Sequence, residues 1–308
     1  MPEWQIERGI GETRAALLDQ GEIVEARILL DGAVRAETVL DARLKQTAAP
    51  AIALAGGVEY LLPHGAPGVA EGGALRIAVT REAIPGAEPW KRPLARATDE
   101  PTGPAPQIDG LETAFPADAG WDDLIEQARS GFVDFRGGLL RISPTPAMTL
   151  IDVDGTLPPA ELAVAGAAAA ARAIRRLDIG GSIGIDLPTL AGKAPRQAAA
   201  AAIDAYLPQP FERTAVNGFG FVQIVRPRNR ASLLEIWSDR PAAEARALLR
   251  RAALSGAGPR RLAAHPRVIA ALAAQPAWLD ALARQLGGPV TLRGDPALAM
   301  SGGHAEPA

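Results

Sequence analysis

The stretch MTLIDVDGTL, residues 148–157, decides how the middle of this chain folds, together with SIGIDL, residues 182–187. Each begins as a short apolar run typical of a buried strand, and each carries an aspartate, Asp152 or Asp186, near the strand's end. An Ala-dense segment of helical character, residues 162–177, separates them. A strand–helix–strand crossover places its strands parallel in one sheet, so we expect both aspartates at the same sheet edge.

Two carboxylates at such an edge suit a hard divalent cation. Mg²⁺ is held in proteins through one or two carboxylates and substrate phosphates, where it can activate water and stabilise charge on a phosphodiester. Asp152 and Asp186 are therefore candidate ligands of Mg²⁺, with Mn²⁺ as a possible substitute. Aspartates at strand ends also cap turns and helices, and that purely structural interpretation stays open.

Outward from this centre, the pattern predicts a mixed α/β (α+β) chain of about two domains. Short β-like runs broken by Gly and Pro between residues 34 and 96 indicate a small barrel. Residues 99–118 are rich in Pro and Gly and predict a linker. Further helices are expected at 121–129, 195–207, from Asp239 towards Gly256, 267–274 and 277–286, further strands at 5–30, 132–142, 219–225 and 290–292, and a frayed tail at 301–308.

Composition excludes several functional classes. The net charge of −3 gives no global basic field, so any RNA site has to be a local patch. The absence of cysteine removes disulfides, thiolate zinc sites and Cys nucleophiles, and it fits a cytoplasmic location. The polar N-terminal sequence is unlike a signal peptide, and no apolar run reaches the length of a membrane span.

The eight residues LIDVDGTL, 150–157, match the signature of haloacid-dehalogenase phosphatases, in which Asp152 would be the nucleophile and Asp154 the acid/base. That family also needs a later Lys and an acidic pair after a strand. Lys193 is the only later Lys, and Asp295 has no acidic neighbour within several residues. The phosphatase is therefore a distant alternative.

Longer blocks resemble the ribonuclease E/G family, in the family's order. The blocks are RGGLLRISPTPAMTLIDVDG (136–155), AAARAIRRLDIGGSIGIDL (169–187) and FGFVQIVRPRNRASL (219–233), preceded by GIGETRAALLDQGEIVEARI (9–28). The resemblance implies an OB-type RNA-binding barrel, an RNase H-like and DNase I-like catalytic core, and a helix-rich C-terminal αβ subdomain. The implied divisions are 1–33 with 115–147 (RNase H-like), 34–97 (barrel), 98–120 (linker), 148–237 (DNase I-like) and 238–308 (C-terminal).

The resemblance also implies residue roles. Asp152 and Asp186 match the family's metal-binding aspartates, while Asp154 stands where the family has Asn. An ionised Asp cannot donate a hydrogen bond to phosphate, so this substitution weakens the expectation of activity, although Asp154 could serve as a third metal ligand. Arginines 226, 228 and 230 would face one side if the preceding strand continued, and they are candidate phosphate ligands.

Other family features are missing. The zinc-binding cysteines and the 5′-phosphate sensor segment have no counterpart, so we expect no zinc and no zinc-linked oligomer, with other homo-oligomers left open. On the barrel, Tyr60 is the only nearby aromatic for base stacking, and Lys45 is a weaker basic candidate. The expected function is Mg²⁺-dependent cleavage of single-stranded RNA, without a membrane partner. The alternative is an RNA-binding protein of the same fold that has lost or weakened cleavage.

Overall fold

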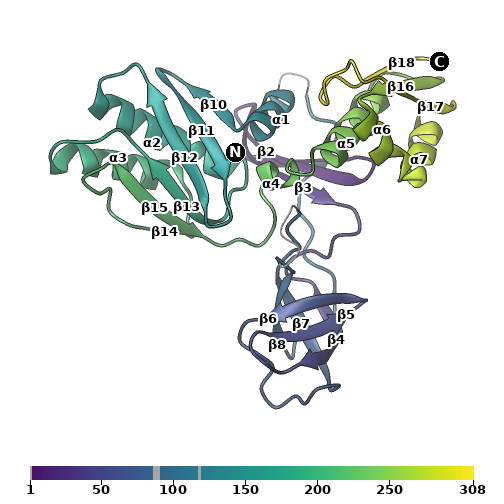
Figure 1. The fold of residues 1–308 in the computed structure, drawn as a ribbon, viewed down its shortest axis with the longest axis horizontal. Helices are drawn as coiled ribbons and strands as arrows, with labels where there is room; N and C mark the ends of the chain where they lie inside the picture. The colour runs from purple at the N-terminus through teal and green to yellow at the C-terminus, as the bar shows by residue number, and fades with distance from the viewer. Residues whose placement is uncertain (1, 86–90, 117–118) are drawn as a thin grey trace.

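A computed structural model describes residues 2–85, 91–116 and 119–308. Its largest sheet, at the left in Figure 1, has six strands in the order β10-β11-β12-β13-β15-β14, and we call this sheet with its helices the central body. Only β12 and β13 pair in parallel, and α2 connects them as the crossover helix. The elements are β10 (Phe132–Phe135), β11 (Gly138–Pro144), β12 (Thr149–Gly155), α2 (Pro159–Arg176), β13 (Gly181–Asp186), α3 (Lys193–Tyr206), β14 (Glu212–Arg213) and β15 (Phe221–Arg226).

Alternation along the central strands explains why one face of this sheet is covered. Ile151 and Val153 of β12, with Ile183 and Ile185 of β13, point to the side on which α2 packs and are buried. The Ala-rich sequence of α2 lets the helix approach closely. At Gly166, a Cβ atom would lie 2.3 Å from Val153 Cγ1, so the helix meets β12 without room for a side chain.

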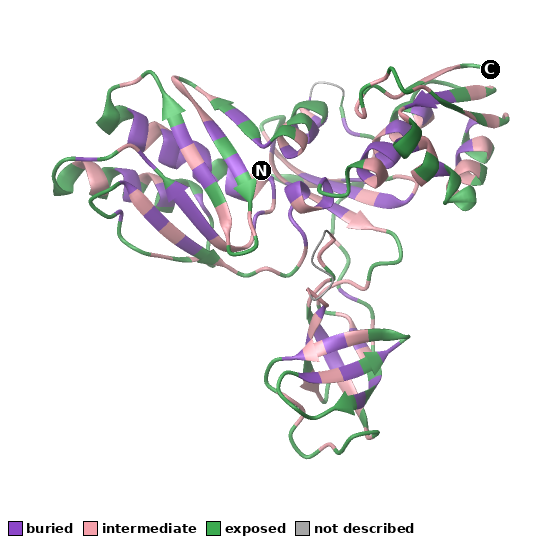
Figure 2. Cartoon of the chain, in the orientation of Figure 1, coloured by how far each residue is buried: buried purple, intermediate pink, exposed green. Residues whose placement is uncertain are grey.

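On the opposite face of the sheet, no helix of the described residues packs in the same way. Leu150 on β12 and Val225 on β15 are 39% and 51% exposed. Figure 2 shows exposed and intermediate residues alternating with buried ones along these strands. Asp152 and Asp154 have the same parity as Leu150, so both belong to this open face.

A second sheet, ordered β3-β2-β1-β9, packs beside the central body. Gln20 and Gly21 both adopt positive φ in the tight turn that joins β2 to β3. Its short fourth strand lies within the predicted linker and pairs with β1, so that segment is partly ordered into the sheet. The elements are β1 (Glu3–Arg8), β2 (Glu12–Asp19), β3 (Glu22–Leu30), β9 (Leu111–Glu112), α1 (Trp121–Ser130) and α4 (Leu233–Ile236).

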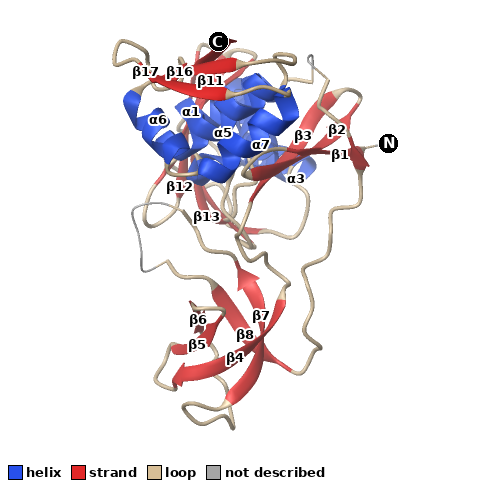
Figure 3. Cartoon of the chain, turned by 90° about the vertical axis from the view of Figure 1, so that its right-hand side faces the viewer, coloured by secondary structure: helices blue, strands red, loops and turns tan. Residues whose placement is uncertain are grey.

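The predicted small barrel is confirmed as a closed five-stranded barrel that projects from the body, as Figures 1 and 3 show. It has its own core, which includes Leu44, Tyr60 and Ile77. The segment directly after β7, which we call the barrel neck, contacts the central body: the Glu82 backbone N–H donates a hydrogen bond of 2.8 Å to the Asn229 carbonyl. The strands are β4 (Val39–Gln46), β5 (Ala51–Ala55), β6 (Val58–Leu62), β7 (Ala74–Arg81) and β8 (Leu94–Thr98), in the order β4-β5-β6-β8-β7.

The C-terminal part combines three helices with a three-stranded sheet, β17-β16-β18. Asp239 caps α5 by accepting a hydrogen bond from the Ala242 N–H, as its sequence context predicts. The prediction of a frayed tail is wrong, because β18 pairs antiparallel with β16. The elements are α5 (Arg240–Ala253), β16 (Arg260–Ala264), α6 (Pro266–Ala273), α7 (Pro276–Leu286), β17 (Val290–Gly294) and β18 (His304–Pro307).

The sheet pairing also regroups the chain. Strands β10 and β11 join the sheet of β12 and β13, so residues 132–144 are continuous with the 148–237 region and separate from the sheet of residues 3–30. The expected domain boundary at residue 147 therefore cuts through one continuous sheet. Among the helices of the described residues, none is both long enough and apolar enough to cross a membrane.

Candidate functional site

The carboxylates of Asp152 and Asp186 form the candidate site. The two residues are direct partners in the parallel ladder of β12 and β13, with Leu150 paired to Gly184 one alternation earlier. Partners on adjacent strands lie about 4.8 Å apart at Cα and carry their side chains on the same face. The predicted juxtaposition is therefore confirmed, although Asp152 lies in the middle of β12 while Asp186 ends β13, and both side chains lie on the open face.

The charges around Asp152 oppose its ionisation. Burial raises the pKa of Asp152 above its ordinary value, and the negative charges of Asp154 and Asp186 raise it further. Arg141, the partner of Asp152 on β11, works in the opposite direction. The negative charges of the aspartates thus outweigh the positive charge of Arg141, and a bound cation would reduce their repulsion.

Asp154 lies two residues beyond Asp152 on the same face and is exposed. Across residues 2–85, 91–116 and 119–308, no three His, Cys, Asp or Glu side chains come together in a metal-binding arrangement. The proposed third-ligand role of Asp154 is therefore not supported by this geometry. Asp154 acts on the site through its negative charge, which raises the pKa of Asp152.

Replacing Asp154 with Asn is expected to lower the pKa of Asp152, because one of the two neighbouring negative charges disappears. Cation binding requires the ionised carboxylate, so the pH midpoint for Mn²⁺ binding should move to lower pH. Electron paramagnetic resonance of free Mn²⁺, recorded across a pH series, measures that midpoint. Asp134→Asn, on the same face but two strands away from β12, is the matched control. An unmoved midpoint in Asp154→Asn would contradict the electrostatic account.

Arg141 is a basic residue of this face that the sequence pattern did not single out. Its guanidinium lies 5.5 Å from the centre of the Phe132 ring on the neighbouring strand β10, and its positive charge acts on Asp152, its ladder partner on β12. Strand alternation in GLLRISP, with Leu140 and Ile142 buried and Arg141 exposed between them, was the available signal. That signal becomes specific only when the β11–β12 register is known, because the register pairs Arg141 with Asp152.

The predicted phosphate-binding arginines lie elsewhere. Strand β15 ends at Arg226, which pairs with Gly181, whereas Asp186 pairs with Phe221 at the other end. Five residues of strand separate the two positions by roughly 17 Å, too far for one phosphate. Each arginine also has an internal partner: Arg226 donates to the Ile179 carbonyl, Arg228 pairs with Glu235, and Arg230 pairs with Asp178.

The reason for this correction is local. Pro227 has no N–H to extend the ladder, so the alternation that would align all three side chains stops at Arg226. The segment that follows instead connects the central body to the barrel neck, as the bond between Asn229 and Glu82 shows. Arg226, Arg228 and Arg230 are therefore removed from the candidate site and assigned to this junction.

The two candidate residues on the barrel, Tyr60 and Lys45, lie in different environments. Tyr60 is 1% exposed and belongs to the barrel core, and burial raises the pKa of its hydroxyl. Its expected role in base stacking is therefore wrong. Alternation along β6 turns Tyr60 and Leu62 inward and leaves Glu59 outside. Lys45 is exposed but forms an ion pair with Glu59, which also pairs with Arg92.

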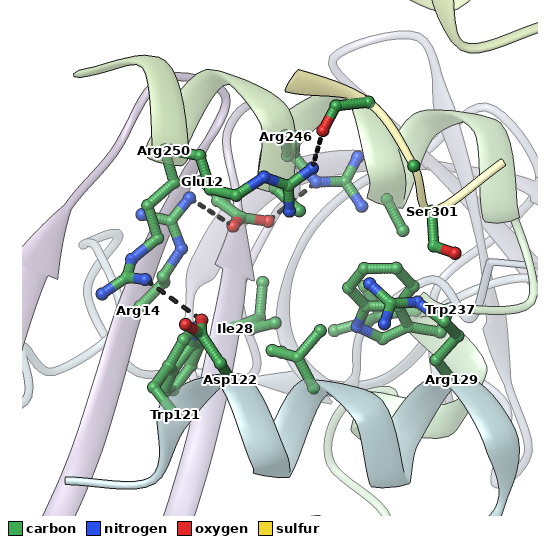
Figure 4. Close-up of a pocket in the computed structure, with 17 residues that line it drawn as sticks. Glu12, Arg14, Ile28, Trp121, Asp122, Arg129, Trp237, Arg246, Arg250 and Ser301 are labelled. Carbon is green, nitrogen blue, oxygen red and sulfur yellow. Dashed lines mark hydrogen bonds and ion pairs between the residues drawn. The ribbon is translucent and has the colours of Figure 1, made fainter. Parts of the chain in front are cut away.

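A more enclosed cavity lies outside this site. It has a volume of about 320 Å³ and is bounded by β2, β3, α1, α4, α5 and the segment 301–303 (Figure 4). Its walls include Arg14, Arg246 and Arg250, which are ion-paired to Glu12, Glu7 or Asp122. Each of these three guanidinium groups has at least one carboxylate partner. The cavity therefore lies at a junction where ion pairs connect the N-terminal sheet to the C-terminal part.

In comparisons with known proteins, the chain matches no family model and no curated protein. What the protein does is therefore inferred from the open sheet face and the charged groups on it.

Proposed function

We propose that this protein is a Mg²⁺-dependent endoribonuclease of the ribonuclease E/G type that cleaves single-stranded RNA. The observation that carries the proposal is the in-register pair of Asp152 and Asp186 on an uncovered sheet face, with Arg141 beside it. The two carboxylates can bind a divalent cation, and the Arg141 guanidinium can donate hydrogen bonds to a phosphate that the same cation contacts.

The donor set fits Mg²⁺. Asp152 and Asp186 would hold it, because adjacent carboxylates that repel each other are stabilised by a shared cation, and Mg²⁺ completes its coordination with water and substrate oxygens. When bound, Mg²⁺ supplies Lewis-acid stabilisation of the phosphodiester and a lowered pKa for the attacking water. The chain's own contribution is to position the phosphate: Arg141 binds a nonbridging oxygen and keeps the linkage against the carboxylate pair.

The shape of the site favours a polymer as substrate. The carboxylates lie on a sheet surface beside exposed Leu150 and Phe132, outside the enclosed cavity described above. Small substrates are normally held in concave pockets that bury most of their surface. An extended strand can instead cross an open face and be cleaved internally.

The remainder of the fold is compatible with this assignment. The five-stranded barrel has the size of an OB-fold, a module that binds oligonucleotides. We assign it as the RNA-binding barrel, the region 148–237 as the DNase I-like core, and residues 1–33 as RNase H-like. The assignment of β10 and β11 follows the observed sheet and not the predicted boundary.

The direct test incubates the purified protein with a 5′-labelled single-stranded RNA of mixed sequence, with Mg²⁺ and with EDTA. We expect internal cleavage with Mg²⁺ that leaves a 5′-phosphate on the downstream product, and none with EDTA. A parallel reaction with p-nitrophenyl phosphate tests the phosphatase alternative suggested by LIDVDGTL. Hydrolysis of that ester without RNA cleavage would overturn the nuclease assignment.

One observation favours a second function, RNA binding without efficient cleavage. Asp154 occupies the position at which the ribonuclease E/G family, which this chain resembles, has Asn. Its side chain adds negative charge to a site that has to accept a phosphate. Under this alternative, single-stranded RNA binds with measurable affinity while cleavage with Mg²⁺ stays at the background rate. Replacement of Asp154 with Asn would then be expected to restore cleavage.

A further inference from the structure

The most exposed aromatic side chain in the described part of the chain lies in the turn before the strand that pairs with Asp186. Phe219 is 80% exposed and occupies the turn that leads into β15. Two residues further on, Phe221 is the direct ladder partner of Asp186. Exposed apolar side chains mark a binding surface where they lie together, so the neighbours of Phe219 decide whether it belongs to one.

The turn that carries Phe219 is held in place by hydrogen bonds. The Asn217 side-chain oxygen accepts from the backbone N–H groups of Phe219 and Phe221, at 2.9 and 3.0 Å. The Leu187 N–H donates to the Gly220 carbonyl, and the Thr189 hydroxyl donates to the Phe219 carbonyl. These contacts fasten the turn to the segment directly after Asp186.

Gly220 shows how closely the two segments meet. Its φ is +94°, and a Cβ atom there would lie 2.2 Å from the Leu187 carbonyl oxygen. No other residue fits that position without moving the turn. Phe219 is therefore displayed outward by a fixed scaffold, so little conformational freedom is lost when a ligand covers it.

Phe221 extends the apolar surface towards the site. At Gly184, a Cβ atom would lie 2.5 Å from Phe221 Cζ and 3.0 Å from Leu150 Cδ2, so the Phe221 ring lies against the bare backbone of β13. Phe221 and Leu150 thus form an apolar surface on the open face beside Asp186, and exposed Phe219 lies in the turn directly before Phe221. We call these three residues the aromatic strip.

We infer that the aromatic strip is a stacking site for unpaired nucleobases, with Phe219 as its principal platform. The inference rests on the proposed function, because it names the part of the RNA that the same face recognises. An aromatic face next to the carboxylate pair, with Arg141 on the other side of the pair, matches a nucleotide's two components, a flat ring and an anionic linkage. A paired base presents no free face to Phe219, so the strip selects single strands over duplexes.

The strip also accounts for what the barrel lacks. Tyr60 is buried, so it cannot stack on a base. Phe219 supplies the missing aromatic face at the site of cleavage instead.

Fluorescence anisotropy with labelled strands tests this inference in EDTA, where cleavage is absent. The probes are a 12-nucleotide single-stranded RNA, the same length of abasic ribose–phosphate, and an RNA duplex. We expect the wild type to prefer the base-bearing single strand. Phe219→Ala should weaken its binding roughly 5- to 150-fold while leaving abasic binding unchanged. Phe219→Trp should restore the preference. Leu254→Ala, 58% exposed on the C-terminal part, is the control.

The outcomes separate the two proposals. A wild type that binds base-bearing and abasic strands equally, or a Phe219→Ala variant that keeps the preference, overturns the stacking site even if RNA is cleaved. Base-dependent binding lost in Phe219→Ala, in a protein that never cleaves RNA, supports the stacking site and overturns the nuclease. A wild type that binds no strand overturns the stacking site, while the cleavage assay with Mg²⁺ decides the nuclease. A change from dimer to monomer in Phe219→Ala, with unchanged RNA affinity, would assign the strip to self-association and overturn the inference.

Discussion

Replacing Asp186 with Asn is expected to reduce Mg²⁺-dependent RNA cleavage by at least about 100-fold, the loss seen when a group that stabilises transition-state charge is removed. Asn has nearly the same shape, but it lacks the charge that holds a cation beside Asp152. Asp186 is exposed, so the fold should tolerate the change. Single-turnover cleavage of labelled RNA at saturating enzyme measures the effect on the chemical step.

Asp152→Asn should have a similar effect on cleavage, and the double variant should lose little more, because the two carboxylates act as one unit. The stability of the folded protein should not fall together with cleavage. The pKa of Asp152 is raised, so its charge is disfavoured in the folded protein, and its contribution to stability falls as the pH rises through that pKa. Asp152→Asn should therefore unfold at the same urea concentration as the wild type, or a higher one, at pH 7.

Asp134→Asn provides the matched control for both variants, since it removes a carboxylate from the same face, two strands away from β12. It should cleave RNA at the wild-type rate. Equal cleavage by Asp152→Asn, Asp186→Asn and the wild type would remove these residues from the site. Cleavage lost together with the folded state would instead indicate a structural role.

The contrast between the aspartate pair and the arginines shows what sequence can predict here. The pairing of Asp152 with Asp186 follows from a local strand–helix–strand unit, whose handedness is nearly invariant. The arginine prediction needed the strand to continue past Arg226, and Pro227 was a visible reason against it. Arg141 was not predictable in the same way, since its place beside Asp152 depends on the register between two separate strands.

Burial and long-range pairing account for the other differences. Tyr60 lies among alternating residues, so its inward direction could be guessed only once the barrel's inner face was known. The polar tail has the composition of a frayed end, but pairing of β18 with β16 outweighs that tendency. Phe219 gives no sequence signal of exposure, because it sits in an apolar block that predicts a buried strand.

The second large effect is expected at Glu7, far from the aspartate pair. The Glu7 side chain is buried and accepts hydrogen bonds from Arg14, from Arg250 and from the Phe115 N–H, at 2.7 to 3.1 Å. Arg250 is 243 residues away in sequence. One carboxylate thus joins two neighbouring strands to helix α5 and fastens the N-terminal sheet to the C-terminal part.

Glu7→Gln is expected to lower the free energy of unfolding by about 3 kcal/mol, because it leaves buried guanidinium groups without part of their counter-charge. Glu112→Gln is the control on the adjacent strand. Its pair with Arg8 is exposed on both sides, so no measurable loss is expected. Urea unfolding followed by tryptophan fluorescence is a suitable measurement, since Trp121 and Trp237 line the same junction.

The pH dependence gives a sharper version of this test. Burial alone would raise the pKa of Glu7, but the hydrogen bond and charge of Arg250, the Phe115 N–H and the charge of Arg14 outweigh it and lower the pKa. The stabilisation is therefore present above the unfolded value of about 4.3 and is lost as the pH falls through the folded value. The stability difference between wild type and Glu7→Gln should be largest near pH 7 and shrink in acid. A difference that stayed constant down to pH 3 would mean that Glu7 acts through packing and not through its charge.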